Sequence, residues 1–126
     1  MTPSKIKLHK QSKTLELHFA AQAFHLSAEF LRVHSPSAEV KGHGPGQEVL
    51  QAGKIDVGFT GIEAVGNYAI KLIFDDGHDS GIFSWSYLYD LCQNHDAYWQ
   101  AYLDKLDAAQ LSRDANTSVV KLLDPK

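Results

Sequence analysis

The feature that most constrains the fold is a series of short apolar runs between residues 57 and 83, separated by two strong turn sequences. Gly66-Asn67 forms the first break, and both residues tolerate the positive φ angles that a tight hairpin requires. Asp75-Asp-Gly-His78 forms the second, where Asp side chains bond nearby backbone and glycine supplies a positive φ. Because each run is short and bounded by turns, we predict an antiparallel three-stranded meander over 57–83.

A second group of strands is predicted near the N-terminus. Residues 6–10 and 14–19 each alternate apolar and polar side chains, and a short polar link joins them. This alternation is typical of an antiparallel hairpin with one buried face, and Phe24-His-Leu26 is a candidate for a third short strand. Ser27 then offers a side-chain oxygen to the free amides of a helix, which Pro36 must end.

Two helices are predicted after the meander. Apolar residues repeat at helical spacing over residues 84–93, and Ser84 can cap the first helix. A second apolar stripe runs over residues 96–110, with Asp96 as the expected N-cap. Both helices therefore have one face suited to covering a sheet.

These elements predict an α+β fold. We expect one antiparallel sheet, built from the N-terminal hairpin and the 57–83 meander and packed by the C-terminal helices. The domain is predicted to span residues 1–112, followed by a flexible C-terminal tail over 113–126. The candidate core residues are Val57, Phe59, Ile62, Val65, Ile70, Leu72, Phe74, Ile82, Trp85, Leu88 and Leu91.

A long segment rich in glycine, proline and serine separates the two groups of strands. It runs over residues 35–54, and we expect at most one helical turn in it, near Glu48-Val-Leu50. Loops of this length within compact domains are often functional. The segment is therefore a candidate binding element.

Composition excludes several classes of function. The chain of 126 residues carries a formal net charge of −3, the wrong sign for a protein that mainly neutralises phosphates, so no nucleic-acid partner is predicted. No apolar run approaches the ~18 residues of a membrane span, and the start lacks the apolar core of a signal peptide. The single cysteine, Cys92, lies on an apolar helix stripe and is expected to be a buried, inert thiol. These features predict a cytoplasmic protein with no membrane partner.

Charge is unevenly distributed along the chain. Four lysines precede the first acidic residue, whereas seven of the eight charged side chains from Asp75 to Asp107 are acidic. Two solvated faces are the simpler interpretation. The alternative is a homodimer in which opposite patches meet, since such patches steer association.

The search for catalytic motifs finds none complete. Gly53-Lys54 resembles the end of a phosphate loop, but Ile55 replaces the Ser or Thr that such a loop needs. No histidine is followed two residues later by an acid, so an iron-binding triad of the oxygenase type is not encoded. The densest set of titratable groups, Asp75, Asp76, His78 and Asp79, suits acid–base chemistry or a hard cation, but also a simple turn.

Three segments in a fixed order resemble a known family. They are Leu31–Val40, Ile62–Ile70 and Phe74–Leu88, and the most specific parts are Val65-Gly-Asn-Tyr-Ala69 and Asp76-Gly-His-Asp-Ser-Gly-Ile82. They are similar to the gamma-butyrobetaine hydroxylase N-terminal-like domain family. That family includes stand-alone bacterial proteins, and its domain also precedes the catalytic domain of carnitine-pathway hydroxylases or is fused to ATPases of iron–sulfur cluster assembly.

The resemblance implies a zinc site that this chain only partly retains. In the hydroxylases, a C-x-C-x-x-C cluster and the histidine of Asp-Gly-His are the ligands, which correspond here to Ser35, Ser37, Val40 and His78. Only His78 is a good zinc ligand, so no metal or other cofactor is expected. A substitute zinc site formed by His34, His43 and His78 is the alternative. The oxygenase domain that performs hydroxylation is not part of the match, so the resemblance gives no catalytic residues.

The resulting hypothesis is a non-catalytic accessory module that binds an unidentified protein partner. Its predicted surface combines the 34–46 loop with the Asp-Gly-His turn. The alternative is a metal-binding or iron–sulfur-assembly accessory protein. The predicted binding residues are Arg32, His34, Glu39, His43, His78 and Asp79.

Overall fold

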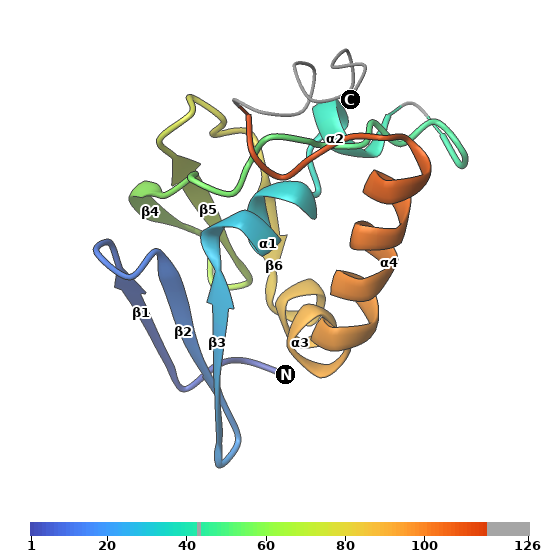
Figure 1. Ribbon diagram of the computed structural model, residues 1–126. Helices are drawn as coiled ribbons and strands as arrows, with labels where there is room; N and C mark the ends of the chain where they lie inside the picture. The colour runs from blue at the N-terminus through green and yellow to red at the C-terminus, as the bar shows by residue number, and fades with distance from the viewer. Residues whose placement is uncertain (43, 116–126) are drawn as a thin grey trace.

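The computed structural model describes residues 1–42 and 44–115. Within them the chain forms strands and helices in the order shown in Figure 1. The elements are β1 (Lys5–His9), β2 (Thr14–Phe19), β3 (Gln22–Ser27), α1 (Ala28–Val33), α2 (Ala38–Lys41), β4 (Phe59–Val65), β5 (Ala69–Phe74), β6 (Ile82–Ser84), α3 (Trp85–Gln93) and α4 (His95–Ala108). The predicted α+β class is confirmed, as are the N-terminal hairpin, its third strand and the meander.

The strands form two antiparallel sheets instead of the single sheet that was expected. One sheet has the order β1-β2-β3 and the other the order β4-β5-β6. Between them in the chain come α1, α2 and a long connection, and Figure 1 shows α1 beside both sheets. Every residue of α1 is buried. A helix that is buried on every side, including its charged residues Glu29 and Arg32, needs cover from more than one direction, and the two separate sheets contribute to it.

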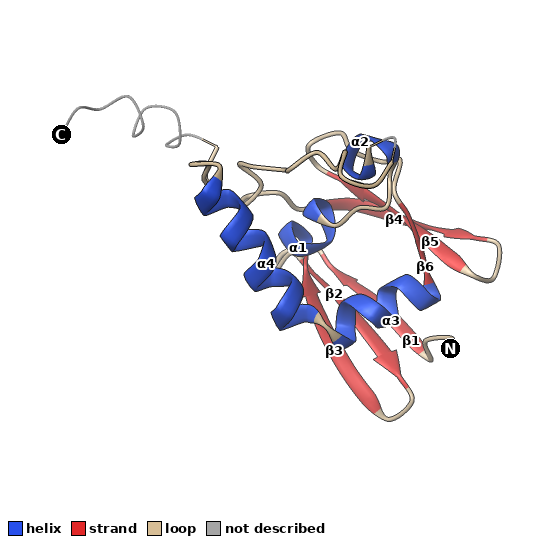
Figure 2. Ribbon diagram, turned by 90° about the vertical axis from the view of Figure 1, so that its right-hand side faces the viewer, coloured by secondary structure: helices blue, strands red, loops and turns tan. Residues whose placement is uncertain are grey.

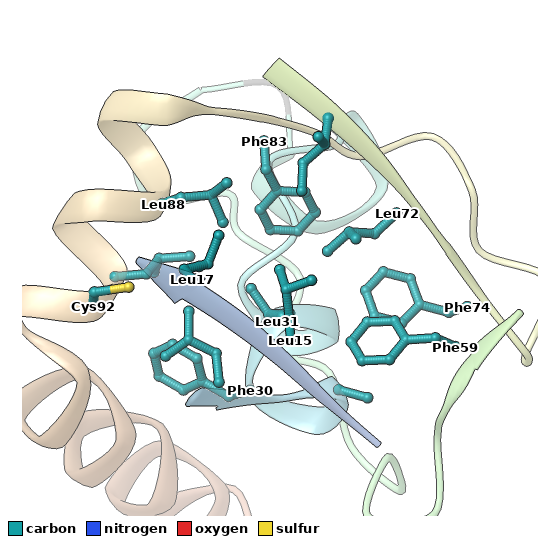
Figure 3. Close-up of a cluster of buried hydrophobic side chains, with 14 of the residues drawn as sticks. Leu15, Leu17, Phe30, Leu31, Phe59, Leu72, Phe74, Phe83, Leu88 and Cys92 are labelled. Carbon is teal, nitrogen blue, oxygen red and sulfur yellow. The ribbon is translucent and has the colours of Figure 1, made fainter. Parts of the chain in front are cut away.

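The hydrophobic core joins both sheets to the helices. Figure 3 shows Leu15 and Leu17 of β2 in one cluster with Phe30 of α1, Phe74 of β5 and Leu88 of α3. All five of these side chains are at most 1% exposed. Of the predicted core residues, the buried ones are Val57, Phe59, Ile70, Leu72, Phe74, Leu88 and Leu91.

The sequence analysis predicted Ile82 as the core residue of β6, but its neighbour Phe83 is the buried one. Ile82 is 45% exposed, whereas Phe83 is fully buried. Phe83 pairs with Ile70, whose side chain points into the core, and Ile82 pairs with Lys71 on the outer face. Because successive strand residues point to opposite faces, this register decides which apolar residue is buried.

Serine caps begin two of the helices, as predicted. Phe30 N–H donates to Ser27 Oγ at 3.0 Å and Tyr87 N–H donates to Ser84 Oγ at 3.2 Å. The predicted cap Asp96 is instead inside α4, which starts one residue earlier, after Asn94. Asn94 also ends α3, so the two helices share one junction residue.

The helical turn in the long connection lies earlier than predicted. The short helix α2 follows Ser37 and ends at Gly42, whose φ of 75° suits glycine. Residues 48–50, the predicted position, are not helical. Of the predicted tail, residues 116–126 lie outside the described residues, and Arg113 pairs with Glu29 of α1.

The predicted burial of Cys92 is confirmed. Cys92 is 7% exposed, and burial raises its pKa to about 12, as expected for an inert thiol. The longest described helix, α4, has 14 residues. In the described part of the chain, no helix combines the length and the apolar character needed to cross a bilayer.

Candidate functional site

The two polar segments that the sequence analysis singled out lie side by side. The Nε2 atom of His78 lies 2.9 Å from Ser35 Oγ and 3.3 Å from Ser37 Oγ. Nearby, the Ser80 hydroxyl donates to Glu39 Oε1 at 2.8 Å. The segment after α1 is therefore tied to the turn after β5 by three side-chain contacts.

Glycines make this approach possible. Phe74 N–H donates to His78 O at 2.9 Å, which closes the turn, and Gly77 within it has a φ of 89°. A Cβ atom on Gly81 would lie 2.1 Å from Ser35 Oγ. Glycine at position 81 is thus required for the serine to reach the imidazole.

Asp76 ties the same turn to α1. Its Oδ2 accepts hydrogen bonds from Arg32 Nε at 2.9 Å and Lys54 Nζ at 3.0 Å. Its Oδ1 accepts one from the backbone N–H of His78 at 3.1 Å. Partial burial opposes ionisation, but these three donors outweigh it and lower the pKa of Asp76 to about 2.

The cluster around His78 is interior. Ser35 is fully buried, and Ser37 and His78 are 4% and 9% exposed. Burial, followed by the charge of Arg32, lowers the pKa of His78, so the imidazole is neutral at pH 7. A neutral ring exchanging hydrogen bonds with two hydroxyls links buried segments without placing a charge in the core.

His34 lies at a different place, in a cleft of about 500 Å³. The cleft is bounded by α2, by residues 48–51 and by the helices α3 and α4, which Figure 2 shows following one another directly in the chain. Its lining residues are Val33, His34, Ser35, Val40, Lys41, Glu48, Val49, Leu50, Gln51, Tyr87, Asp90, Leu91, Tyr98, Ala101, Tyr102 and Lys105. This size and the mixture of apolar, aromatic and charged residues are typical of a binding site.

The backbone and ring of His34 are both fixed. The ring Nδ1 lies 2.8 Å from Phe30 O, and the Tyr87 hydroxyl donates to His34 O at 2.6 Å. The His34 ring stacks near Tyr98, with 6.1 Å between centroids, and Tyr102 meets it edge-on at 6.3 Å. Burial lowers the pKa of His34, so its ring is neutral at pH 7.

The six predicted binding residues therefore fall into separate places. His34 lines the cleft, Arg32 and His78 are buried, and Glu39 and Asp79 are exposed beside the buried cluster. His43 lies outside the described residues.

Sequence reasoning missed the helical wall of the cleft. Tyr98, Ala101, Tyr102 and Lys105 follow the i, i+3, i+4, i+7 spacing of one helix face. The apolar stripe predicted for this helix was Trp99, Tyr102/Leu103 and Leu106; it shares Tyr102 with this face and was expected to cover the sheet. The spacing carried the signal, but only the position of residues 48–51 turns this face into a cleft.

A comparison with protein-family models identifies the family of this chain. Residues 6–89 match the model described as gamma-butyrobetaine hydroxylase-like, N-terminal. The chain belongs to this family. A comparison with curated proteins found no match.

Solved structures of similar proteins agree with this family. One solution NMR structure is 57% identical and has a TM-score of 0.82, with 98% of each chain covered. A second is 50% identical with a TM-score of 0.75, covering 89% of this chain and 84% of that chain. A crystal structure from Acidithiobacillus ferrooxidans is 34% identical with a TM-score of 0.59, covering 71% of this chain and 91% of the other; it is described as a protein of unknown function in the DUF971 family.

The zinc site implied by the resemblance to the gamma-butyrobetaine hydroxylase-like family does not fit the residues present here. The positions Ser35, Ser37 and His78 do converge, but both hydroxyls are engaged by the imidazole nitrogen that would face a metal. A neutral hydroxyl is a poor zinc ligand, and Val40 has no donor atom. The family position is filled by an internal hydrogen-bonded cluster.

The alternative zinc site also gains no support from the described residues. Among residues 1–42 and 44–115, no group of three or more His, Cys, Asp or Glu side chains is arranged to hold a metal ion. His34 and His78 each use a ring nitrogen within the protein. Since His43 is outside the described residues, the site of His34, His43 and His78 stays a prediction.

Proposed function

We propose that this member of the gamma-butyrobetaine hydroxylase-like N-terminal family is a non-catalytic module that binds a partner protein through the cleft beside His34. The observation that carries the proposal is a contrast between two neighbouring regions. Ser35, Ser37 and His78 of the family segments bond to each other in the interior, whereas the cleft is open and lined by aromatic, apolar and charged residues. Pockets of this kind receive the anchoring side chains of partners.

The arrangement of Ser35 and His78 supports binding over catalysis. A serine hydroxyl 2.9 Å from an imidazole nitrogen has the spacing of a nucleophile and its base. However, Ser35 is fully buried although it borders the cleft, and its oxygen packs between His78 and Gly81, so it is not open to a substrate. The pair is better explained as a structural tie between the turn after β5 and the segment after α1.

The other titratable groups near the family segments are also engaged. Asp75 Oδ1 accepts the Gly58 N–H at 2.9 Å, and Asp76 is paired with Arg32 and Lys54. These bonds favour a structural role for the Asp-Asp-Gly-His turn over acid–base chemistry.

The test uses two matched substitutions on α4. Ala101 lines the cleft and is exposed, while Ala108 is exposed on the same helix outside the cleft lining. Ala101→Arg should fill the cleft and Ala108→Arg should not. Immobilised wild-type and variant chains would be used to capture proteins from cells that produce this one, with quantitative mass spectrometry as the readout.

We expect one specific partner to be recovered by the wild-type and Ala108→Arg chains and to fall at least about tenfold with Ala101→Arg, because an interface centre contributes more than about 1.4 kcal/mol. Equal recovery by both variants would contradict the proposal. Metal content of the untagged wild-type chain is measured in parallel, and a stoichiometric ion would favour the metal-binding alternative.

A further inference from the structure

One hydrogen-bond acceptor of the cleft lining, the Nε2 atom of His34, has no partner within the described part of the chain. The backbone oxygen of Phe30 can only accept, so the Nδ1 atom of His34, 2.8 Å away, must carry the ring proton. In the neutral ring Nε2 is then an acceptor, and it has no hydrogen-bond partner among the described residues. No fully buried side-chain nitrogen or oxygen in the described part of the chain lacks a partner. Nε2 is therefore not fully buried, and His34 lines the cleft.

The tyrosine hydroxyls around His34, unlike its Nε2 atom, all have hydrogen-bond partners within the protein. The three tyrosine hydroxyls of the cleft donate within the protein: Tyr87 to His34 O, Tyr98 to the Asp90 carboxylate at 2.9 Å, and Tyr102 to Gln51 O at 2.7 Å. Each tyrosine thus offers a ring surface while its proton is already used. His34 is left as the unmatched polar group between aromatic walls.

Charged side chains lie farther out on the lining. Lys41 of α2 is 4.9 Å above the Tyr87 ring, and Lys105 of α4 is exposed. Neither lysine has an ion pair among the described residues. Asp90 of α3 is engaged by Tyr98, and Glu48 is exposed. The ring of His95 of α4 also contacts Phe30, at 4.4 Å between centroids, but His95 is not part of the cleft lining.

This lining selects among the side chains of a partner. A carboxylate would place an acceptor against the acceptor of His34, and a lysine ammonium would lose its hydration between the aromatic rings. Phenylalanine has no donor and would leave Nε2 unpaired. An indole has a single N–H donor, no acceptor and a large apolar surface.

We propose that the cleft receives a tryptophan side chain of the partner protein, with the indole N–H donating to His34 Nε2. This inference rests on the proposed binding function and deepens it. Acidic residues next to that tryptophan would face Lys41 and Lys105 at the rim. Tryptophan is among the residues that most often anchor protein interfaces, because it buries a large rigid surface.

The test compares two probes that differ only in the donor. Indole and 1-methylindole have nearly the same ring shape, but methylation removes the N–H. Each is titrated into the ¹⁵N-labelled full chain, and amide and histidine ring signals are followed by NMR. Indole should shift His34, Tyr98 and Tyr102 saturably and bind about fivefold more tightly than 1-methylindole, as one net hydrogen bond predicts.

A pair of histidine variants tests whether His34 Nε2 is the atom that accepts the hydrogen bond from the indole N–H. His34→Phe keeps an aromatic ring and removes the acceptor, so both probes should bind this variant equally. His95→Phe is the matched control, and the preference for indole should persist in it. Spectral dispersion checks that each variant is folded, and the comparison of the two probes on the wild-type chain does not depend on either variant.

Two results would overturn the assignment. One is equal binding of the two probes by the wild-type chain. The other is the absence of saturable shifts in the cleft at about 5 mM indole, a concentration suited to the weak affinity of a single side chain. If either result were obtained while Ala101→Arg still failed to capture the partner, the assignment of a tryptophan to the cleft would be wrong, but the proposed binding function would stand. Equal partner recovery by Ala101→Arg and Ala108→Arg would contradict the function itself.

Discussion

At the scale of single residues, the buried contact between Ser35 and His78 depends on the absence of a side chain at Gly81. The serine oxygen occupies the space that a Cβ atom would need. Sequence analysis identified His78 as the retained ligand position and Ser35 as a replaced one. It did not indicate that the two would bond to each other, because they are 43 positions apart.

Replacing Gly81 by alanine should therefore destabilise the protein through Ser35. We expect Gly81→Ala to lower the free energy of unfolding by about 1–3 kcal/mol, the usual cost of overpacking. In a Ser35→Ala background the nearest side-chain atoms to the new methyl are at 3.4 Å, so the same substitution should cost less than about 1 kcal/mol. Urea unfolding of the four proteins in this double-mutant cycle measures the difference.

Gly44 provides the control for this cycle. A Cβ atom there has no neighbour within 4 Å, so Gly44→Ala should change stability little. An equal cost of Gly81→Ala in both backgrounds would show that the serine is not what excludes a side chain.

At the scale of elements, the outer face of the β1-β2-β3 sheet gathers histidines around one carboxylate. Glu16 of β2 accepts hydrogen bonds from His9 at 2.8 Å and from His18, and His25 Nε2 lies 3.7 Å from Glu16 Oε1. His25 is directly opposite Glu16 in the strand register. Cross-strand neighbours on one face of a sheet are close enough for such bonds.

This arrangement predicts an unusual titration for Glu16. Hydrogen bonds from His18 and then His9 lower its pKa from 4.5 to about 2. Because the folded-state pKa is depressed, the stabilisation is fully present above about pH 4.5 and is lost as the pH falls toward 2. Carboxyl ¹³C NMR should give a midpoint near 2 for Glu16, and His18→Ala should move it upward. An unchanged midpoint in His18→Ala would contradict this account.

Stability measurements provide a second check on Glu16. The wild-type chain should be more stable than Glu16→Gln above about pH 4.5, and the difference should shrink as the pH approaches 2. Acid unfolding of the two chains, followed by circular dichroism, gives this comparison.

The predictions for individual elements succeeded where local chemistry decides. Ser27 and Ser84 cap their helices because a serine oxygen can reach an amide three residues later. The exposure of Ile82 and burial of Phe83 were not predicted, because both are apolar and only pairing with β5 distinguishes them. The second C-terminal helix was predicted over residues 96–110, but α4 starts at His95. Only Asn94 separates it from the end of α3 at Gln93.

At the scale of the whole molecule, a charged pair connects α1 to the segment after α4. Arg113 donates to both oxygens of Glu29, at 2.8 and 2.7 Å. Glu29 is only 6% exposed, and the guanidinium of Arg113 lies 5.1 Å from the centre of the Trp99 ring. A bidentate pair of this kind orients both partners.

Removing Arg113 should weaken the fold more than removing a surface ion pair. Arg113→Ala leaves the Glu29 carboxylate buried without its partner, and we expect a loss of about 1–3 kcal/mol in the free energy of unfolding. Lys71→Ala is the control, because Lys71 and Glu63 form a more exposed pair at 3.3 Å, worth about 0–1 kcal/mol. Equal losses of stability in thermal or urea unfolding would mean that the Arg113–Glu29 pair contributes no more than the exposed Lys71–Glu63 pair.

The sequence by itself determined the local structure and the family relationship. Alternation, turn residues and caps act over a few positions, so they were sufficient for the meander, the hairpin and the helices α1, α3 and α4, but not for the position of α2. Tertiary structure decided which segments meet: it placed the strands in two sheets, joined Ser35 and Ser37 to His78, and brought residues 48–51 opposite α4 to form the cleft. These contacts depend on how the apolar faces of distant elements pack together, and no local pattern in the chain specifies that packing.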